Sequence, residues 1–186
     1  KVIANSLEFK KNLKKDLNLD AICIYNPLDQ NQIKKKSKIK STKIFNSSRK
    51  LKILNIGRFT KQKDQLTFLK SLNFIKNKIN FEARIIGRGE LKSKLQKYIE
   101  INNLKKNVKI INYKNNPYPF IKQADLFVLS SRFEGLPNVI LESLVLKKFV
   151  ISSKCPTGPK EILLNGRGGL LFDVENYVGL ASKIIY

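Results

Sequence analysis

One glutamate lies in the middle of a stretch that otherwise contains almost only apolar residues. We predict a helix over residues 138–146, because Pro137 suits the first position of a helix and the residues after it are nearly all apolar. Such a helix is expected to be buried, and the ionised carboxylate of Glu142 is disfavoured there unless it is hydrogen-bonded. Because Glu142 lies one turn beyond Asn138, it can point toward the helix N-terminus. There it could accept hydrogen bonds from both hydroxyls of a ribose, although a pairing with a lysine of an adjacent element is the alternative.

A second carboxylate precedes this helix. Glu134 lies in the loop before Pro137, where a sugar ring could meet it. Backbone amides at the start of a helix are free to bind anions, so those of Gly135, Leu136 and their neighbours could take a phosphate.

Two cations, Arg58 and Lys63, flank the start of another predicted helix, over residues 62–78. Cations oppose the helix dipole at this end, so they weaken the helix unless an anion lies between them. A diphosphate would suit the position, since arginine offers a fork to two oxygens and lysine a point charge. The simpler interpretation is that both side chains are solvated.

Two further turns carry weaker signals. Gly87-Arg88-Gly89 lacks the third glycine of a dinucleotide fingerprint, and a structural turn is the better interpretation. Residues 152–162 form a turn rich in Pro and Gly, for which a plain loop is the simplest reading. Cys23 and Cys155 are far apart in the chain and are most simply free thiols.

The absence of histidine excludes several kinds of chemistry. A chain without His cannot build a Cys/His zinc site, a Ser-His or Cys-His dyad, or a His general base. Any chemistry here must therefore use carboxylates, basic groups and backbone amides. The 186 residues include 42% apolar ones, as in globular domains, but no run near the roughly 20 apolar residues of a membrane span.

The elements that would position these residues alternate regularly from residue 51 onward. Alternating strands and helices predict right-handed βαβ units and a parallel sheet, which makes this an α/β, Rossmann-like, doubly wound domain. In such folds ligands bind beyond the carboxyl ends of the strands. We predict strands at 52–56, 81–86, 108–111, 126–129, 149–151 and 169–172, and helices at 62–78, 90–101, 119–123, 138–146, 160–164 and from 175 onward.

The first 50 residues are less regular. Ser6 can cap a short helix, residues 21–25 resemble a strand, and residues 30–49 are polar and rich in lysine, so we interpret them as a solvated connector. We therefore expect residues 1–50 to be a junction segment and connector, and residues 51–186 to be the Rossmann-like domain. The chain contains no Met and its last predicted helix has no cap, so we expect it to be a fragment that is truncated at its C-terminus.

The net charge of +23 has three possible origins. Only six of the 37 basic residues are Arg, and abundant Lys, Asn and Ile indicate an AT-rich genome, so codon bias alone is one interpretation. Attraction to an anionic membrane surface and nucleic-acid binding are the others. The lysines are spread along the whole chain rather than clustered.

Taken together, the motifs resemble those of retaining glycosyltransferases of family 4. The most specific is a Glu-x7-Glu signature, and the others fall in the same order and at the same distances as in that family. The family usually has Gly where Asn112 stands, and Asn is the next-best residue for a left-handed turn. The matching stretches are Asn26-Pro27-Leu28-Asp29, Gly57-Arg58 with Lys63, Asn116-Pro117-Tyr118, residues 124–131, 133–144 and 155–163, the last resembling members that build cell-surface polysaccharide or lipid-linked glycans.

This resemblance implies the C-terminal, donor-binding half of a GT-B fold. It implies an enzyme that transfers a hexose or N-acetylhexosamine from a nucleotide-sugar donor, with uridine favoured, and that needs no metal or other cofactor. The resemblance assigns roles to nine residues: Arg58 and Lys63 for the diphosphate, Glu142 for the ribose, Glu134 for the donor sugar at the catalytic position, Gly135, Leu136 and Pro137 for loop contacts, and Asn112 and Tyr113 near the base.

The resemblance also implies partners. These are a glycan or lipid-linked acceptor, the N-terminal domain of the same protein, and a peripheral contact with anionic membrane at the cytoplasmic inner face of a bacterial cell. Without the N-terminal half we expect donor binding and no turnover. The alternatives are a basic nucleic-acid-binding module and a non-enzymatic nucleotide-binding domain of the same fold.

Overall fold

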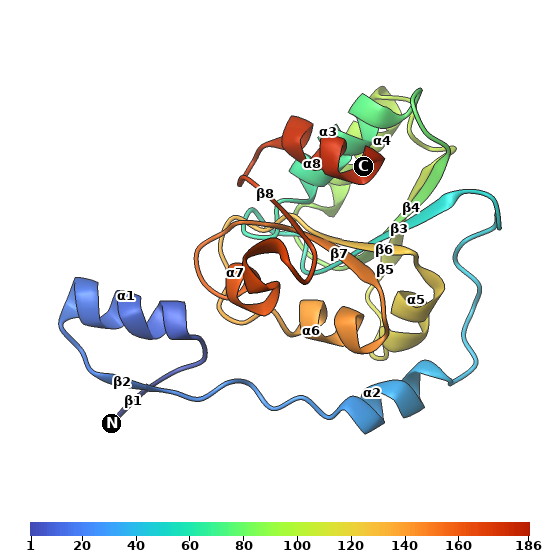
Figure 1. Cartoon of the computed structure of the whole chain (residues 1–186). Coiled ribbons are helices and arrows are strands. Elements are labelled where there is room, and N and C mark those ends of the chain that lie inside the picture. Colours follow the sequence, from blue (N-terminus) through green and yellow to red (C-terminus); the bar gives the residue numbers. More distant parts are fainter.

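A six-stranded parallel sheet forms the centre of the molecule. The computed structural model describes residues 1–186, and Figure 1 shows this sheet between two layers of helices. The strands lie in the order β5-β4-β3-β6-β7-β8 and all neighbours are parallel. They are β3 (Leu51–Ile56), β4 (Phe81–Gly87), β5 (Val108–Asn112), β6 (Leu126–Leu129), β7 (Phe149–Ser153) and β8 (Leu170–Phe172).

This strand order creates a switch point between β3 and β6. From β3 the chain adds β4 and β5 in one direction, and from β6 it adds β7 and β8 in the other. The loops after β3 and β6 therefore connect to opposite sides of the sheet, and doubly wound folds bind ligands at the carboxyl ends of the strands at such a point. The predicted α/β Rossmann-like fold is confirmed, as are all six predicted strands to within two residues.

Helices cover both faces of the sheet. One layer holds α3 (Gln65–Ile75), α4 (Lys92–Ile101) and α8 (Tyr177–Ile185), and the other α5 (Tyr118–Gln123) and α6 (Asn138–Val145) (Figure 1). Adjacent residues of a strand point to opposite faces, so Ile53 packs under the first layer and Leu54 under the second. Short helical turns, α7 (Pro159–Ile162) and η1 (Leu164–Gly166), lead into β8.

The helix that carries Glu142 is less buried than its composition suggests. Only Ile140 and Ser143 are buried in α6, and Glu142 is half-buried. Its apolar side chains divide between the sheet and the neighbouring helices α2 (Gln30–Ser37), α5 and α7, none of which encloses it. The prediction of a fully buried helix is therefore wrong.

Residues 30–49 also differ from the expected solvated connector. Helix α2 begins at Gln30, where Asp29 accepts a hydrogen bond from the Gln32 amide at 2.8 Å, and it packs on α5 and α6. Ile33 and Phe45 are 3% and 1% exposed. One apolar residue on the inner face of a helix is enough to dock it, and a lysine-rich composition hides that signal.

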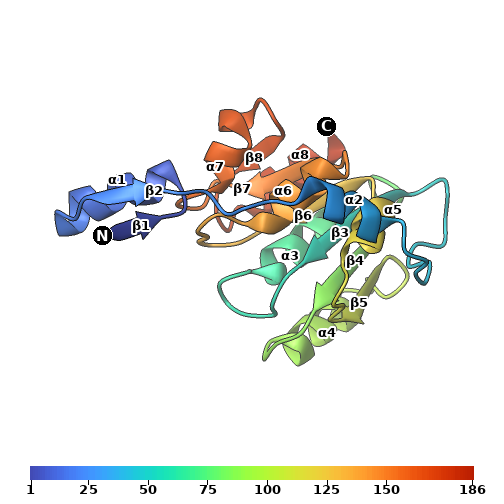
Figure 2. The same ribbon diagram turned by 90° about the horizontal axis from the view of Figure 1, so that it is seen from below.

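The first 25 residues form a small unit of their own. Strands β1 (Val2–Ala4) and β2 (Ala21–Cys23) pair in parallel around helix α1 (Leu7–Leu17), which Ser6 caps as predicted. This unit projects from the side of the larger domain (Figure 2). No residue of α1 is buried.

No helix of this structure combines the length and the apolar composition that crossing a bilayer requires.

Replacing Gly87 by Ala should destabilise the domain by about 1–3 kcal/mol, the usual cost of overpacking. An added Cβ would lie 2.0 Å from the carbonyl oxygen of Gly57 and 2.8 Å from the Phe59 ring. Gly57→Ala is the matched control, because a Cβ there would meet no atom closer than 3.4 Å. Urea denaturation measures both losses, and equal losses would contradict the close approach of the two turns.

Candidate functional site

Three loops converge at the carboxyl ends of β3, β6 and β7. Gln62 lies in the loop after β3, and its side-chain amide donates to the carbonyl of Phe133 at 3.0 Å. Its backbone carbonyl accepts from the Arg132 amide at 2.8 Å. Ser130 donates to the carbonyl of Lys63 at 3.1 Å. These contacts join the loops on the two sides of the switch point, where the fold predicts a ligand.

An ion pair links the same two loops. The ammonium of Lys63 lies 2.6 Å from Oε1 of Glu134, and the two side chains are only 18% and 7% exposed. The Ser131 hydroxyl donates to the same oxygen at 2.5 Å. The structure thus brings together two residues that the sequence placed in separate motifs.

The Pro- and Gly-rich turn of residues 152–162 contacts the loop that holds Glu134. Thr157 donates its hydroxyl to the carbonyl of Glu134, whose amide points at the carbonyl of Pro156, 3.5 Å away. Gly158 has φ of +76°, and a Cβ there would lie 2.0 Å from the carbonyl oxygen of Gly135. The backbone of this turn therefore fits against the loop that holds Glu134, and the plain-loop interpretation stays a prediction.

Several groups of these loops have no partner within the protein. The amides of Gly135 and Leu136 donate no hydrogen bond, and the guanidinium of Arg58 is exposed without an ion pair. Pro137 is the N-cap of α6, in an extended conformation, one residue before the first helical position that the sequence suggested for it. An anion is the ligand that free amides and a free guanidinium would bind.

Helix α3 begins later than predicted because a carboxylate caps it. Asp64 accepts from the Thr67 amide at 3.3 Å and from its hydroxyl at 2.8 Å, so the helix starts at Gln65. Lys63 consequently lies in the loop before the cap. The Asp-x-x-Thr spacing was a readable capping signal in the sequence.

Glu142 faces the loop that follows β5. It accepts a hydrogen bond from the hydroxyl of Tyr118, the first residue of α5, at 3.3 Å. Burial raises the pKa of the Glu142 carboxyl, and the Tyr118 hydrogen bond offsets only part of this effect. No lysine pairs with Glu142, so that alternative is excluded. Tyr118 is the residue near this carboxylate that sequence reasoning missed as a site residue.

Asn112 and Tyr113 lie at the end of β5, near the sheet edge. Asn112 pairs with Gly87 in the strand ladder and accepts from the ammonium of Lys92 at 2.8 Å. It has no positive φ, so the expected left-handed turn is wrong. The guanidinium of Arg88 lies over the half-exposed ring of Tyr113, 4.7 Å from its centroid.

The first 25 residues contact the domain next to this site. Glu161 of α7 accepts hydrogen bonds from the Leu7 amide, at 3.0 Å to Oε2, and from the Tyr25 hydroxyl. The hydrogen bond to Glu161 raises the pKa of Tyr25 to about 12. Asn26 donates to the side chain of Asn138 at 2.9 Å. A pocket of about 320 Å³ lies between this junction and helices α6 and α7.

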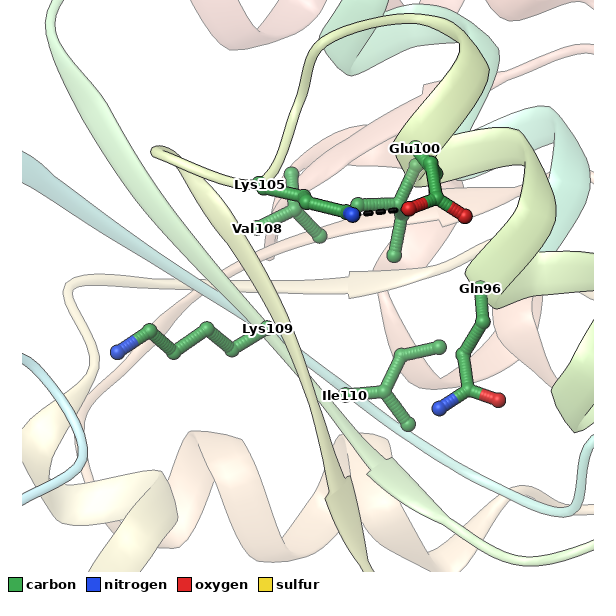
Figure 3. Close-up of a pocket in the computed structure, with 7 residues that line it drawn as sticks. Gln96, Glu100, Lys105, Val108, Lys109 and Ile110 are labelled. Atoms are coloured by element: carbon green, nitrogen blue, oxygen red, sulfur yellow. Dashed lines mark hydrogen bonds and ion pairs between the residues drawn. The ribbon is translucent and has the colours of Figure 1, made fainter.

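A larger hollow lies elsewhere. Figure 3 shows it between the end of α4 and strand β5, with a volume of about 580 Å³ and an ion pair between Glu100 and Lys105. It is at the sheet edge where β5 begins, opposite to the carboxyl ends. Its size therefore does not identify it as the functional site. The structure contains no group of three or more His, Cys, Asp or Glu residues suited to a metal ion.

Comparison with known families gives a direct match. Residues 29–186 match the family described as glycosyl transferases group 1, which covers the whole sheet and the site. The chain belongs to this family. The match includes α2, and begins at the residue that caps it.

Two curated glycosyltransferases illustrate the similarity. An uncharacterised glycosyltransferase of Methanocaldococcus jannaschii is 46% identical over 111 residues, which are 59% of this chain and 27% of that protein. The Campylobacter jejuni N-acetylgalactosamine-N,N'-diacetylbacillosaminyl-diphospho-undecaprenol 4-alpha-N-acetylgalactosaminyltransferase is 32% identical over 124 residues, or 67% of this chain and 33% of that protein.

Solved structures share the fold. A glycosyltransferase from Rickettsia africae superposes with a TM-score of 0.83 at 20% identity, covering all of this chain and 52% of its own. An Anabaena protein, Alr3699/HepE, solved with UDP, gives 0.83 at 21% identity over 99% of this chain and 52% of its own. The chain thus spans about half the length of these structures. The superpositions show that its α/β fold is that of GT-B glycosyltransferases.

Glu142→Gln should make the ligand-free chain more stable than the wild type at pH 7. The pKa of Glu142 is higher in the folded than in the unfolded chain. The free energy of unfolding is therefore highest at low pH, where the carboxyl is protonated in both states, and it falls as the pH rises through the folded pKa. The neutral amide avoids the loss. Thermal melts at pH 7 and pH 4 measure the difference, which should shrink at pH 4, near the ordinary carboxyl pKa of about 4.3. A variant that is less stable than the wild type at pH 7 would contradict this prediction.

Proposed function

We propose that this chain is the donor-binding half of a retaining glycosyltransferase. The observation that carries the proposal is the meeting of a free guanidinium, a Lys63–Glu134 ion pair and free amides at one switch point. Family membership makes the reaction class a glycosyl transfer. The finer roles below are assigned from the chemistry of each group.

The diphosphate of the donor lies between the loops after β3 and β6 in this proposal. Arg58 supplies a two-pronged donor, Lys63 a single charge, and the amides of Gly135 and Leu136 the remaining hydrogen bonds. Pro137 keeps this turn aligned with α6. Asp64 already caps α3, so the anion is held by side chains and by the signature loop rather than by the amides of that helix.

The nucleoside lies toward β5. Glu142 accepts hydrogen bonds from the ribose hydroxyls, and its contact with Tyr118 orients it toward the loop after β5. Asn112 ends β5 and Tyr113 begins that loop, and we place both beside the base. Uridine is supported by the UDP in the Anabaena neighbour and by the family resemblance.

The donor sugar meets Glu134. Transfer breaks the bond between the anomeric carbon and the diphosphate and forms one to the acceptor oxygen on the same face. The proton of the acceptor hydroxyl passes to the departing diphosphate, which leaves as the nucleoside diphosphate. We place the acceptor, a glycan or a lipid-linked glycan, on the N-terminal domain, so residues 1–186 alone bind donor without turnover. The Campylobacter relative, whose name includes a diphospho-undecaprenol, supports a lipid-linked acceptor.

The net charge of +23 supports a peripheral contact with the inner face of a membrane, where anionic lipids attract basic proteins. The lysines of α2 (Lys34, Lys35 and Lys36) are exposed and available for such a contact. This localisation is part of the proposal.

Calorimetric titration with UDP tests donor binding. Wild type should bind UDP, and Glu142→Gln should weaken this binding by about ten- to a hundredfold while sparing pyrophosphate, since one hydrogen bond to a charged group contributes about 1.5–3 kcal/mol. Single-stranded DNA of matched charge at two salt concentrations is the control, and its binding should be weak and lost at high salt. Equal losses for UDP and pyrophosphate would contradict the ribose assignment, and tight DNA binding without a response to UDP, GDP or ADP would contradict the proposed function.

Arg58→Ala should weaken the binding of UDP and pyrophosphate alike, by about 1.5–3 kcal/mol, because a charged hydrogen-bond donor is removed. Arg167→Ala is the matched control, since Arg167 is exposed and precedes β8. It therefore lies at the amino ends of the strands, whereas Arg58 lies at the carboxyl ends. The same titrations measure both variants. A loss below roughly 0.5 kcal/mol for Arg58→Ala would rule out its role.

A further inference from the structure

The Lys63–Glu134 ion pair joins two groups that would serve different parts of the donor. The pair is short, at 2.6 Å, and largely enclosed. In the proposed function Lys63 holds the diphosphate and Glu134 meets the sugar. As the structure stands, each is the other's counter-ion, so the cation is already neutralised before any donor arrives.

A diphosphate entering this site meets two obstacles. It must take Lys63 from a carboxylate that is already in hydrogen-bonding contact, and it must then lie near that negative charge. In a site with little water both effects are stronger than at an exposed surface. A carboxylate beside a phosphate site therefore lowers its affinity for an anion.

Glu134 cannot move far away from the site. Ser131 donates to its carboxylate at 2.5 Å, and its backbone is held by the hydroxyl of Thr157 and by Gly158 packed on Gly135. These contacts keep the carboxylate near Lys63 while leaving Oε2 without any hydrogen bond in the protein. The side chain is thus positioned to exchange one partner for another.

We propose that Glu134 competes with the diphosphate for Lys63, and that this competition makes the site favour the intact nucleotide sugar over the nucleoside diphosphate. The inference rests on the proposed function. When a nucleotide sugar binds, Glu134 loses the ammonium but gains the hydroxyls of the sugar. When only the nucleoside diphosphate is present, Glu134 gains nothing and draws Lys63 back. The ion pair is therefore a specificity determinant that assists product release.

The test is a set of calorimetric titrations of the full chain with UDP and with pyrophosphate. Glu134→Gln removes the competing charge and should tighten the binding of both ligands roughly three- to tenfold, the range expected for one partly buried ion pair. In a Lys63→Ala background the same substitution should give a smaller gain, because there is no cation left to release and only the repulsion between the carboxylate and the diphosphate is relieved. Unchanged or weaker binding of UDP by Glu134→Gln would overturn the inference.

A matched control separates local competition from a general change of charge. Glu100→Gln also removes a carboxylate that pairs with a lysine, Lys105, but at the opposite edge of the sheet (Figure 3). It should leave UDP and pyrophosphate affinity within twofold of wild type. An equal gain in Glu100→Gln would overturn the inference, since net charge alone would then explain it.

Two further outcomes distinguish the inference from the proposed function. UDP binding by wild type with no gain in Glu134→Gln overturns the inference and leaves the proposed function standing. No binding of UDP or pyrophosphate by wild type or variant overturns both. If Glu134→Gln fails to give a cooperative thermal melt, Glu134→Asp takes its place. Its carboxylate is one methylene further from Lys63, and it should tighten UDP binding in the same direction.

Discussion

The pairing of β3 with β6 is the contact on which the site depends. Ile53 and Leu54 lie opposite Leu126 and Phe127, although two strands and three helices separate them along the chain. Because the strands are parallel, their carboxyl ends lie at one edge, and the loops that follow must leave toward opposite sides. The Lys63–Glu134 ion pair then bridges the gap between these loops. Without this strand order the two charges would have no reason to meet.

Close backbone contacts keep these loops at the separation that the ion pair requires. The carbonyl of Gly57 lies over Gly87, and that of Gly135 over Gly158, at distances that no side chain would permit. Each contact joins a loop to the turn after the neighbouring strand. These close contacts lower the local stability of the fold, and so does the half-buried carboxylate of Glu142. Groups that would stabilise a plain domain poorly are thus concentrated where a ligand would bind.

The strands and the two glutamates could be predicted from the sequence because each depends on local patterns. Alternating apolar residues predict a strand wherever it pairs, and a carboxylate in an apolar helix is conspicuous in one dimension. The partners of these residues could not be predicted. Thr157 reaches Glu134 from the loop after β7, and no spacing indicates that. Ser131 lies in the same loop as Glu134, three residues earlier, but its type alone does not indicate the contact. In α2 the buried residue Ile33 lies in a lysine-rich stretch that conceals this apolar contact.

Asn112 shows a different limit of sequence reasoning. A family preference for glycine suggested a left-handed backbone, but a glycine can also serve where no side chain is needed. In this chain Asn112 completes the ladder with Gly87, and its side chain accepts from Lys92. The conformation of a residue is decided by its strand partner as much as by its type.

The segment from Lys154 to Glu161 contacts both the site and the first 25 residues. Its Thr157 and Gly158 hold the Glu134 loop, while Glu161 accepts hydrogen bonds from Leu7 and Tyr25. A carboxylate at the N-terminus of α1 satisfies amides that would otherwise be unpaired, and it complements the helix dipole. The unit of residues 1–25 is therefore attached to the larger domain next to Glu134. The placement of this unit and the geometry of the signature loop therefore both depend on contacts with one short stretch of chain.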